Sequence, residues 1–152
     1  MDRNQMQRRE KASAYFRQGY NCAQAVAMAF ADEVNMDEKT LAKLASSFGG
    51  GMGRLREVCG AVSGMLLVYG MMRGYDDPND REGKTQQYKI IQEMAGEFEG
   101  KHDSIICREI LKKPKGPEYY EPEERTNKYY ALRPCETCVY DAVKILKKYL
   151  IK

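Results

Sequence analysis

The chain has 152 residues, the usual size of a single folded domain. Hydrophobic residues make up 43% and charged residues 31%, which is the composition of an ordinary globular protein. The formal net charge of +3 is small and spread along the chain, and it argues against nucleic acid or an anionic membrane surface as a partner.

No targeting or membrane-spanning segment is expected from the sequence. Residues 1–13 are charged and lack the apolar core of a secretory signal. The longest apolar run, residues 61–72, contains interior glycines and is too short to span a bilayer. We therefore expect a cytoplasmic protein.

Apolar residues recur at helical spacing through the first third of the chain. Residues 3–18 consist of good helix formers and end at Gly19, a residue typical of helix C-caps. Asn21 can cap a second helix over residues 22–33. A third helix is predicted over residues 37–48, where it meets three consecutive glycines.

The rest of the chain is also predicted to be helical. Residues 57–73 form a buried helix, residues 81–99 a long amphipathic one, and residues 104–112 a short one with Ser104 as its cap. The last helix begins near Pro134. No segment pairs as a strand, and no repeat or domain boundary is evident. The sequence therefore predicts one all-α domain over residues 1–152, a compact bundle of about six to seven helices.

Residues 48–64 read FGGGMGRLREVCGAVSG and raise the possibility of a phosphate-binding loop. A P-loop needs a preceding strand and a Lys-Ser/Thr pair, whereas here a helix precedes the glycines and Gly53 is followed by Arg-Leu. The stretch is instead predicted to be a tight corner that delivers Cys59 at the start of the next helix. Gly60 and Gly64 would then keep one face of that helix thin enough for close packing.

Cysteines carry the main chemical signal. An odd number without an export signal argues against a secreted disulfide framework. All but the last fall at or near predicted helix starts, where free backbone N–H groups and the helix dipole stabilise a thiolate. Free cysteines are also often simply buried, so that alternative stays open. The five residues are Cys22, Cys59, Cys107, Cys135 and Cys138.

Cys135 and Cys138 form a C-x-x-C motif at a predicted helix start. This spacing places both sulfurs on one face, close enough to form a disulfide or to bind one metal ion. A thioredoxin-like version would need a preceding strand, which is not predicted. A zinc or iron–sulfur site would need further thiolates, which the other three cysteines can supply. The single histidine, His102, lies in a charged segment and is expected to be solvated, outside the site.

A second class of function centres on the glycine corner. Backbone N–H groups and arginines there could bind a small anion or a protein partner, with the cysteines acting only in packing. Arg54 beside Cys59 would also lower the pKa of that thiol. The candidate binding residues are Gly49, Gly50, Gly51 and Arg54.

The combination of these motifs resembles the family of redox-active proteins named after its cysteine pattern, C_GCAxxG_C_C. Residues 59–64 read Cys-Gly-Ala-Val-Ser-Gly where the family name writes Gly-Cys-Ala-x-x-Gly. The resemblance implies a small helical protein of anaerobic bacteria or archaea that acts in redox chemistry or electron transfer, and it names no substrate. The matching segments are residues 19–26, residues 48–64, Cys107, Cys135 and Cys138.

The first hypothesis is thus a thiol-redox or electron-transfer protein, either an oxidoreductase or an electron carrier. All five cysteines would converge at one end of the bundle. Cys135 and Cys138 would alternate between dithiol and disulfide, or would join the other cysteines in binding an iron–sulfur cluster or zinc. The expected partner is a redox protein of unknown identity, with no nucleic acid and no membrane, and a homodimer is left open. The alternative is a non-catalytic helical module that binds at the glycine corner.

Overall fold

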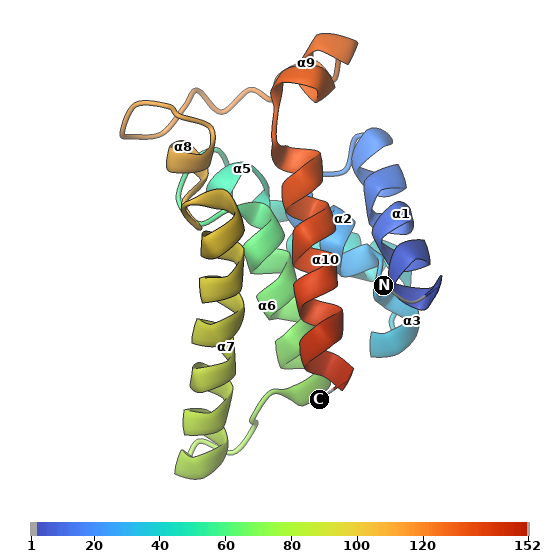
Figure 1. The fold of residues 1–152 in the computed structure, drawn as a ribbon, viewed down its shortest axis with the longest axis vertical. Helices are drawn as coiled ribbons and strands as arrows, with labels where there is room; N and C mark the ends of the chain where they lie inside the picture. The colour runs from blue at the N-terminus through green and yellow to red at the C-terminus, as the bar shows by residue number, and fades with distance from the viewer. Residues whose placement is uncertain (1–2, 152) are drawn as a thin grey trace.

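The computed structural model describes residues 3–151, and helices occupy most of that range (Figure 1). Within these residues there is no β-strand, only an isolated bridge between Val58 and Ile106, so the predicted all-α class is confirmed. None of the helices in this range has the length and hydrophobicity needed to cross a membrane. The helices are α1 (Arg3–Arg17), α2 (Cys22–Met28), α3 (Ala31–Val34), α4 (Glu38–Ala45), α5 (Gly49–Met52), α6 (Gly60–Arg73), α7 (Arg81–His102), α8 (Cys107–Ile110), α9 (Asn127–Leu132) and α10 (Cys135–Ile151), with a 3-10 turn at Ser46–Phe48.

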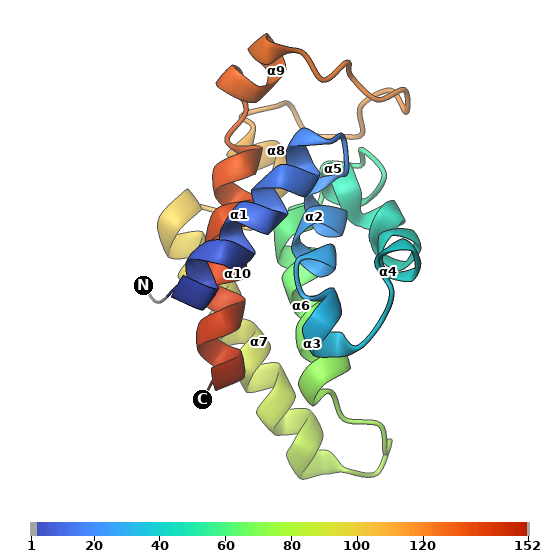
Figure 2. The ribbon, with the colours of Figure 1, turned by 90° about the vertical axis from the view of Figure 1, so that its right-hand side faces the viewer.

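The longer helices account for the predicted bundle. Those with seven residues or more are α1, α2, α4, α6, α7 and α10. Helices α6, α7 and α10 run along the long axis, and α7 runs opposite to the other two (Figure 1). The starts of α6 and α10 therefore lie at the same end as the C-terminal end of α7, near α5 and α8 (Figure 1). Helix α1 packs on α10 and α2, and α2 packs on α6 and α4 (Figure 2).

Several predicted boundaries differ from the observed ones. The helix predicted over residues 22–33 is interrupted between α2 and α3, where Phe30 has φ −110° and ψ 15° and its ring is fully buried. The helix predicted over residues 104–112 is reduced to α8, because the hydroxyl of Ser104 accepts a hydrogen bond from the N–H of Ile106 instead of capping a helix. Helix α9 lies in a segment for which the sequence predicts no helix.

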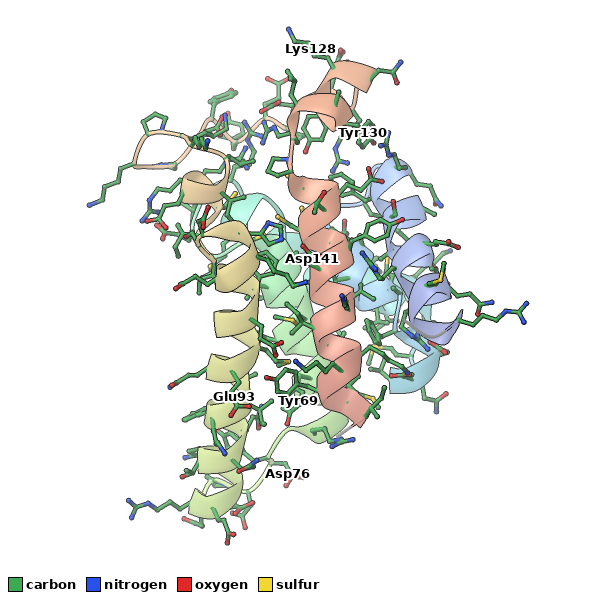
Figure 3. The ribbon with its side chains drawn as sticks, in the orientation of Figure 1. Tyr69, Asp76, Glu93, Lys128, Tyr130 and Asp141 are labelled. Carbon is green, nitrogen blue, oxygen red and sulfur yellow. The ribbon has the colours of Figure 1, made fainter. Side chains whose placement is uncertain are left out.

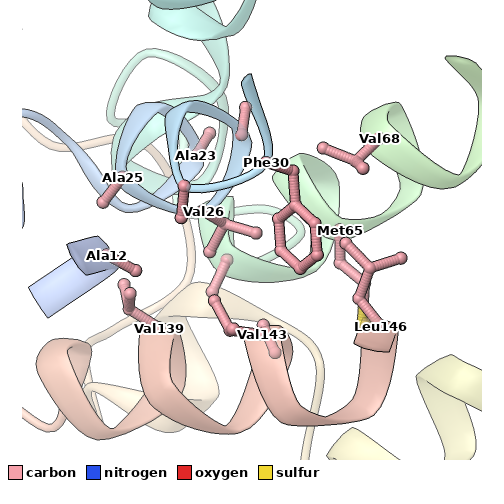
Figure 4. Close-up of a cluster of buried hydrophobic side chains, with 14 of the residues drawn as sticks. Ala12, Ala23, Ala25, Val26, Phe30, Met65, Val68, Val139, Val143 and Leu146 are labelled. Atoms are coloured by element: carbon pink, nitrogen blue, oxygen red, sulfur yellow. The ribbon is translucent and has the colours of Figure 1, made fainter. Parts of the chain in front are cut away.

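The hydrophobic core lies between α2, α6 and α10, with α1 along its edge (Figure 4). Phe30, Met65 and Leu146 are fully buried there, and each such side chain contributes about 1.5–3 kcal/mol of transfer free energy. The contact between α2 and α6 depends on Gly64, because a Cβ atom at that position would lie 2.7 Å from the carbonyl oxygen of Ala23. The thin face predicted for this helix is therefore confirmed.

A buried arginine ties α1 to α3. The guanidinium of Arg8, only 8% exposed, donates hydrogen bonds to the carbonyl oxygen of Ala29 and to Asp32, both at 2.6 Å. The hydrogen bond from Arg8 lowers the pKa of Asp32 to about 2. The ion pair therefore fastens the first helix of the chain to the core.

Candidate functional site

One cavity of about 50 Å³ brings together residues from distant parts of the sequence. Its lining residues include Gly60 and Cys135, the first residues of α6 and α10. These two helices begin at the same end of the molecule (Figure 1). Every cysteine in the chain is a free thiol and contributes to its wall, so the arrangement has the convergence that the first hypothesis requires. The cysteines lining it are Cys22, Cys59, Cys107, Cys135 and Cys138.

A capping box positions Cys22. The side chain of Asn21 accepts a hydrogen bond from the N–H of Gln24 at 2.9 Å, and the Gln24 side chain accepts one from the N–H of Asn21 at 3.0 Å. This reciprocal pair ends the loop at a defined residue, because it satisfies backbone donors that the helix itself cannot satisfy. Cys22 is consequently the first residue of α2, as the sequence predicts.

Backbone pairing places Cys59 beside Cys107. The N–H of Cys59 donates to the carbonyl of Ile105 at 2.7 Å, and the N–H of Cys107 donates to the carbonyl of Glu57 at 2.6 Å. Gly51 permits this close approach. Its φ of +67° favours glycine, and a Cβ atom there would lie 2.6 Å from the Cβ of Cys107. The glycine corner is therefore part of the wall around the cysteines.

The first turn of α10 carries Cys135 and Cys138. Cys135 is half-buried, whereas Cys138 is only 1% exposed. The carboxylate of Glu136, between them, accepts a hydrogen bond from Arg17 at 2.7 Å and another from the hydroxyl of Ser13. These contacts anchor the start of α10 on α1 and so hold both sulfurs in place.

The thiols form two hydrogen-bonded pairs across different elements. The thiol of Cys22 is hydrogen-bonded to that of Cys135, and the thiol of Cys138 is hydrogen-bonded to that of Cys59. All four sulfurs also interact electrostatically with one another. The sequence motif suggests exchange between Cys135 and Cys138, but in the structure each has its thiol partner elsewhere. We call Cys22/Cys135 the outer pair, because both are half-buried, and Cys59/Cys138 the inner pair, because both are buried.

The outer pair contains one acidic and one weakly acidic thiol. The hydrogen bond from Cys22 lowers the pKa of Cys135 to about 7, against the opposing effect of burial, and three cationic side chains add to it: Arg133, Arg56 and Arg125. The same hydrogen bond, together with burial, raises the pKa of Cys22 well above its usual range. Cys135 is thus the thiol of the outer pair that ionises near neutral pH, with Cys22 as its proton-bearing partner.

The inner pair has the same asymmetry. The hydrogen bond from Cys138 lowers the pKa of Cys59, and the backbone N–H groups of Ala61 and Val62 at the start of α6 add to this shift. The pKa of Cys138 is raised strongly, first by its hydrogen bond to Cys59 and then by burial. Cys138 therefore keeps its proton at a pH where the two acidic thiols, Cys59 and Cys135, have lost theirs.

Cys107 lies at the edge of the cluster beside an arginine. Burial raises its pKa, and Arg56 opposes this shift through a hydrogen bond from Nη1 to the sulfur at 3.5 Å. Arg56 also donates from Nε to Glu118 at 2.7 Å. Arg54 instead donates to the carbonyl of Tyr119 at 2.7 Å and to Glu118 at 3.2 Å. The arginine beside a sulfur is therefore Arg56, whereas the sequence favours Arg54.

The predicted anion-binding residues are divided between two hollows. Gly51 lines the cysteine cavity, whereas Gly49 and Arg54 line a neighbouring pocket of about 180 Å³, and Gly50 lines both. The guanidinium of Arg54 already has Glu118 as a counter-ion. An external anion would have to compete with that carboxylate. Anion binding at the glycine corner stays a prediction.

His102 belongs to the surroundings of the cluster, although the sequence suggests a solvated side chain. Only 10% of its side chain is exposed, and its ring packs on Phe98 with centroids 4.6 Å apart. Its Nδ1 atom lies 3.8 Å from the sulfur of Cys138, and its Nε2 atom lies 2.8 Å from Asp141, which Figure 3 labels on α10. Spacing of three residues on a helix places Cys138 and Asp141 on one face, but only the packing of α7 on α10 brings the histidine to them.

The cysteine cluster has the donor chemistry of a metal site but not the arrangement of one. Thiolates are the ligands that zinc and iron–sulfur clusters use, so the donor chemistry fits. Across residues 3–151, however, no three or more His, Cys, Asp or Glu side chains are arranged to hold a metal ion. The thiols are instead hydrogen-bonded to one another in pairs. A zinc or iron–sulfur centre stays a prediction for metal analysis.

Comparison with known proteins shows the family of the chain. The family model described as "Putative redox-active protein (C_GCAxxG_C_C)" matches residues 20–149, a range that contains all five cysteines and the glycine corner. The chain belongs to this family. Membership in the C_GCAxxG_C_C family confirms the resemblance seen in the sequence and supports a redox role in general terms. No curated protein and no solved structure shows significant similarity to the chain.

Proposed function

We propose that this member of the C_GCAxxG_C_C family carries out thiol–disulfide exchange, with the outer pair meeting the substrate and the inner pair holding two further electrons. A single observation carries the proposal: four free thiols from three segments line one cavity, where Cys22 is paired with Cys135 and Cys59 with Cys138. Within each pair the pKa of one thiol is lowered and that of the other is raised. That asymmetry separates an attacking thiolate from a resolving thiol within each pair.

Cys135 is the attacking group. A pKa of about 7 leaves about half of this thiol ionised at neutral pH, and exchange is fastest when the pKa of the attacking thiol lies near the ambient pH. The substrate class is a disulfide, because attack by the Cys135 thiolate on one of its sulfurs forms a mixed disulfide. The bond between the two substrate sulfurs breaks, and the other sulfur leaves as a thiolate.

Cys22 completes the exchange. Its proton passes to the departing thiolate, and the Cys22 sulfur then attacks the sulfur of Cys135 in the mixed disulfide. A Cys22–Cys135 disulfide forms, and the second half of the substrate leaves as a thiolate that takes a proton from water. The protein has lost two electrons, and the substrate disulfide has gained them as two thiols.

Disulfide mapping tests this function directly. The reduced protein is mixed without oxygen with excess 2-hydroxyethyl disulfide, quenched with acid, alkylated and mapped by peptide mass spectrometry. We expect Cys22–Cys135 and Cys59–Cys138 linkages. The variant Cys135→Ser abolishes the first linkage, and Cys107→Ser, the matched control, leaves both unchanged.

Two results would contradict the proposal. One is a Cys135–Cys138 linkage in place of the cross-element pairs. The other is zinc or iron in the purified protein, measured on the same sample, with the cysteines protected from alkylation until the metal is removed.

A further inference from the structure

Cys138 has a chemical problem that the proposed exchange does not solve. It must lose its proton before its sulfur can form a bond, yet its pKa is the one raised strongly in the inner pair. It is also buried, so bulk water does not reach it freely. A nearby proton acceptor is therefore needed if the inner pair is to be oxidised.

The only histidine in the chain contacts this sulfur. The His102 Nδ1 atom lies 3.8 Å from the Cys138 Sγ, and the carboxylate of Asp141 lies 2.8 Å from Nε2 on the other side of the ring. A carboxylate at Nε2 favours the tautomer that carries its proton there, which leaves the Nδ1 lone pair facing the thiol. The ring also packs on Phe98, so its orientation is fixed by contacts at both ring nitrogens and on one face.

The surroundings of His102 stabilise the positive charge that its ring gains when it takes up a proton. Asp141 compensates the positive charge that the imidazole gains, and the C-terminal end of α7, where His102 is the last residue, does the same. The titratable groups that contact the ring are Cys138 and Asp141, both from α10. The arrangement thus has the order carboxylate, imidazole, thiol that general-base activation of a nucleophile requires.

We propose that His102, oriented by Asp141, is the general base that removes the proton of Cys138 when electrons pass from the inner pair to the outer pair. This proposal rests on the proposed function, which supplies the oxidised outer pair. In the transfer, the Cys59 thiolate attacks the Cys22 sulfur. The Cys22–Cys135 bond breaks and its electron pair leaves on Cys135, whose low pKa makes it the better leaving group.

The second half of the transfer uses the base. His102 takes the proton of Cys138, and the resulting thiolate attacks Cys59 in the Cys59–Cys22 disulfide. A Cys59–Cys138 disulfide forms, Cys22 leaves as a thiolate, and the proton held by His102 is returned to it through water. One disulfide is broken and one is formed, and two electrons and one proton have moved from the inner pair to the outer pair.

A time course of both disulfides tests the assignment. The reduced full-length protein is mixed with 2-hydroxyethyl disulfide at pH 7, quenched in acid at intervals and mapped by mass spectrometry. In His102→Gln we expect the outer disulfide to form at the native rate and the inner one about 100-fold more slowly, the lower end of the usual general-base contribution. The deficit should narrow as the pH is raised to 9, because solvent base then replaces the imidazole. Asp141→Asn should slow the same step, and Asp103→Asn, at an exposed neighbouring carboxylate, should not.

The outcomes separate this proposal from the proposed function. If His102→Gln forms the inner disulfide at the native rate, or if its deficit is equal at pH 7 and pH 9 while Asp141→Asn is normal, His102 is not the base. If the outer disulfide fails to form in the unmodified protein, thiol–disulfide exchange itself is wrong. Should His102→Gln fail to fold, as judged by its helical circular dichroism, Asp141→Asn carries the test by the same criteria.

Discussion

Replacing Cys22 with alanine should change the pH dependence of Cys135 in a specific way. The hydrogen bond from the Cys22 thiol is the largest cause of the low pKa of Cys135, which is about 7. Without that donor the pKa should rise toward the ordinary cysteine value of about 8.5. The ionised fraction at pH 7 then falls from about one half to about 3%, a decrease of about 16-fold.

The observed rate should fall by less than the ionised fraction. A thiolate of higher pKa is intrinsically more nucleophilic, with a Brønsted coefficient of about 0.4–0.5, so a rise of about 1.5 units returns a factor of about five. We therefore expect Cys22→Ala to react with 2-hydroxyethyl disulfide about threefold more slowly than the native protein at pH 7. At pH 10, where Cys135 is ionised in both proteins, the variant should react about fivefold faster, and the two rates should be equal at about pH 8.

The assay follows the loss of free Cys135 by quenched alkylation and peptide mass spectrometry, from pH 6 to pH 10. Cys107→Ala is the matched control, because Cys107 lines the same cavity but makes no hydrogen bond to Cys135. Its profile should overlay the native one. If the Cys22→Ala and native profiles coincide over the whole pH range, the hydrogen bond between the outer thiols does not set the reactivity of Cys135, and the reasoning is refuted.

Three stability predictions follow from the packing. Gly51→Ala should lower the free energy of unfolding by about 2–4 kcal/mol, because the backbone there is left-handed and the new Cβ would meet a close neighbour. Gly53→Ala should lower it by only about 1–2 kcal/mol, because Gly53 has φ +59° but no close neighbour. Equal urea midpoints of the two variants would show that the close contact at Gly51 has no effect. Gly64→Ala should lower the urea midpoint of unfolding, because the new Cβ would lie too close to the backbone of Ala23. Gly70→Ala on the same helix should leave the midpoint unchanged or raise the stability by up to about 1 kcal/mol, because the nearest neighbour of a Cβ there is 3.9 Å away. A lower midpoint in both variants would show that the cause is helix flexibility and not the contact with α2. Asp32→Asn should destabilise the protein by about 1 kcal/mol at pH 7, since that carboxylate is largely exposed and screened. Its pKa is lowered on folding to about 2, so its stabilisation is present above about pH 4 and is lost as the pH falls through about 2. The free energies of unfolding of the native protein and the variant should therefore converge as the pH is lowered from about 4 to about 1, and a difference that persists at about pH 1 would exclude the ion pair as its cause.

Much of the local structure around the site could be predicted because its causes are local. The capping side chain of Asn21 predicts the start of α2. The spacing of apolar residues in α10 predicts the face that this helix buries. The break at Phe30 could not be predicted, because the residues on both sides are good helix formers. The helix is interrupted there because the ring of Phe30 is buried in the core. Helix α9 could not be predicted either, because it lies next to a proline-broken segment and none of its residues is buried.

By itself the sequence determined the helical class, the C_GCAxxG_C_C resemblance and the placement of cysteines at helix starts, since helix periodicity, capping and motif spacing involve residues near one another in the chain. Only the tertiary structure decided which thiols meet. Cys135 and Cys138 are neighbours in sequence, yet their hydrogen-bonded partners come from α2 and from the start of α6. The same holds for His102, whose contact with Cys138 exists because two antiparallel helices pack side by side. A thiol's acidity depends on the donors, charges and solvent within a few ångströms, and these neighbours are chosen by the fold.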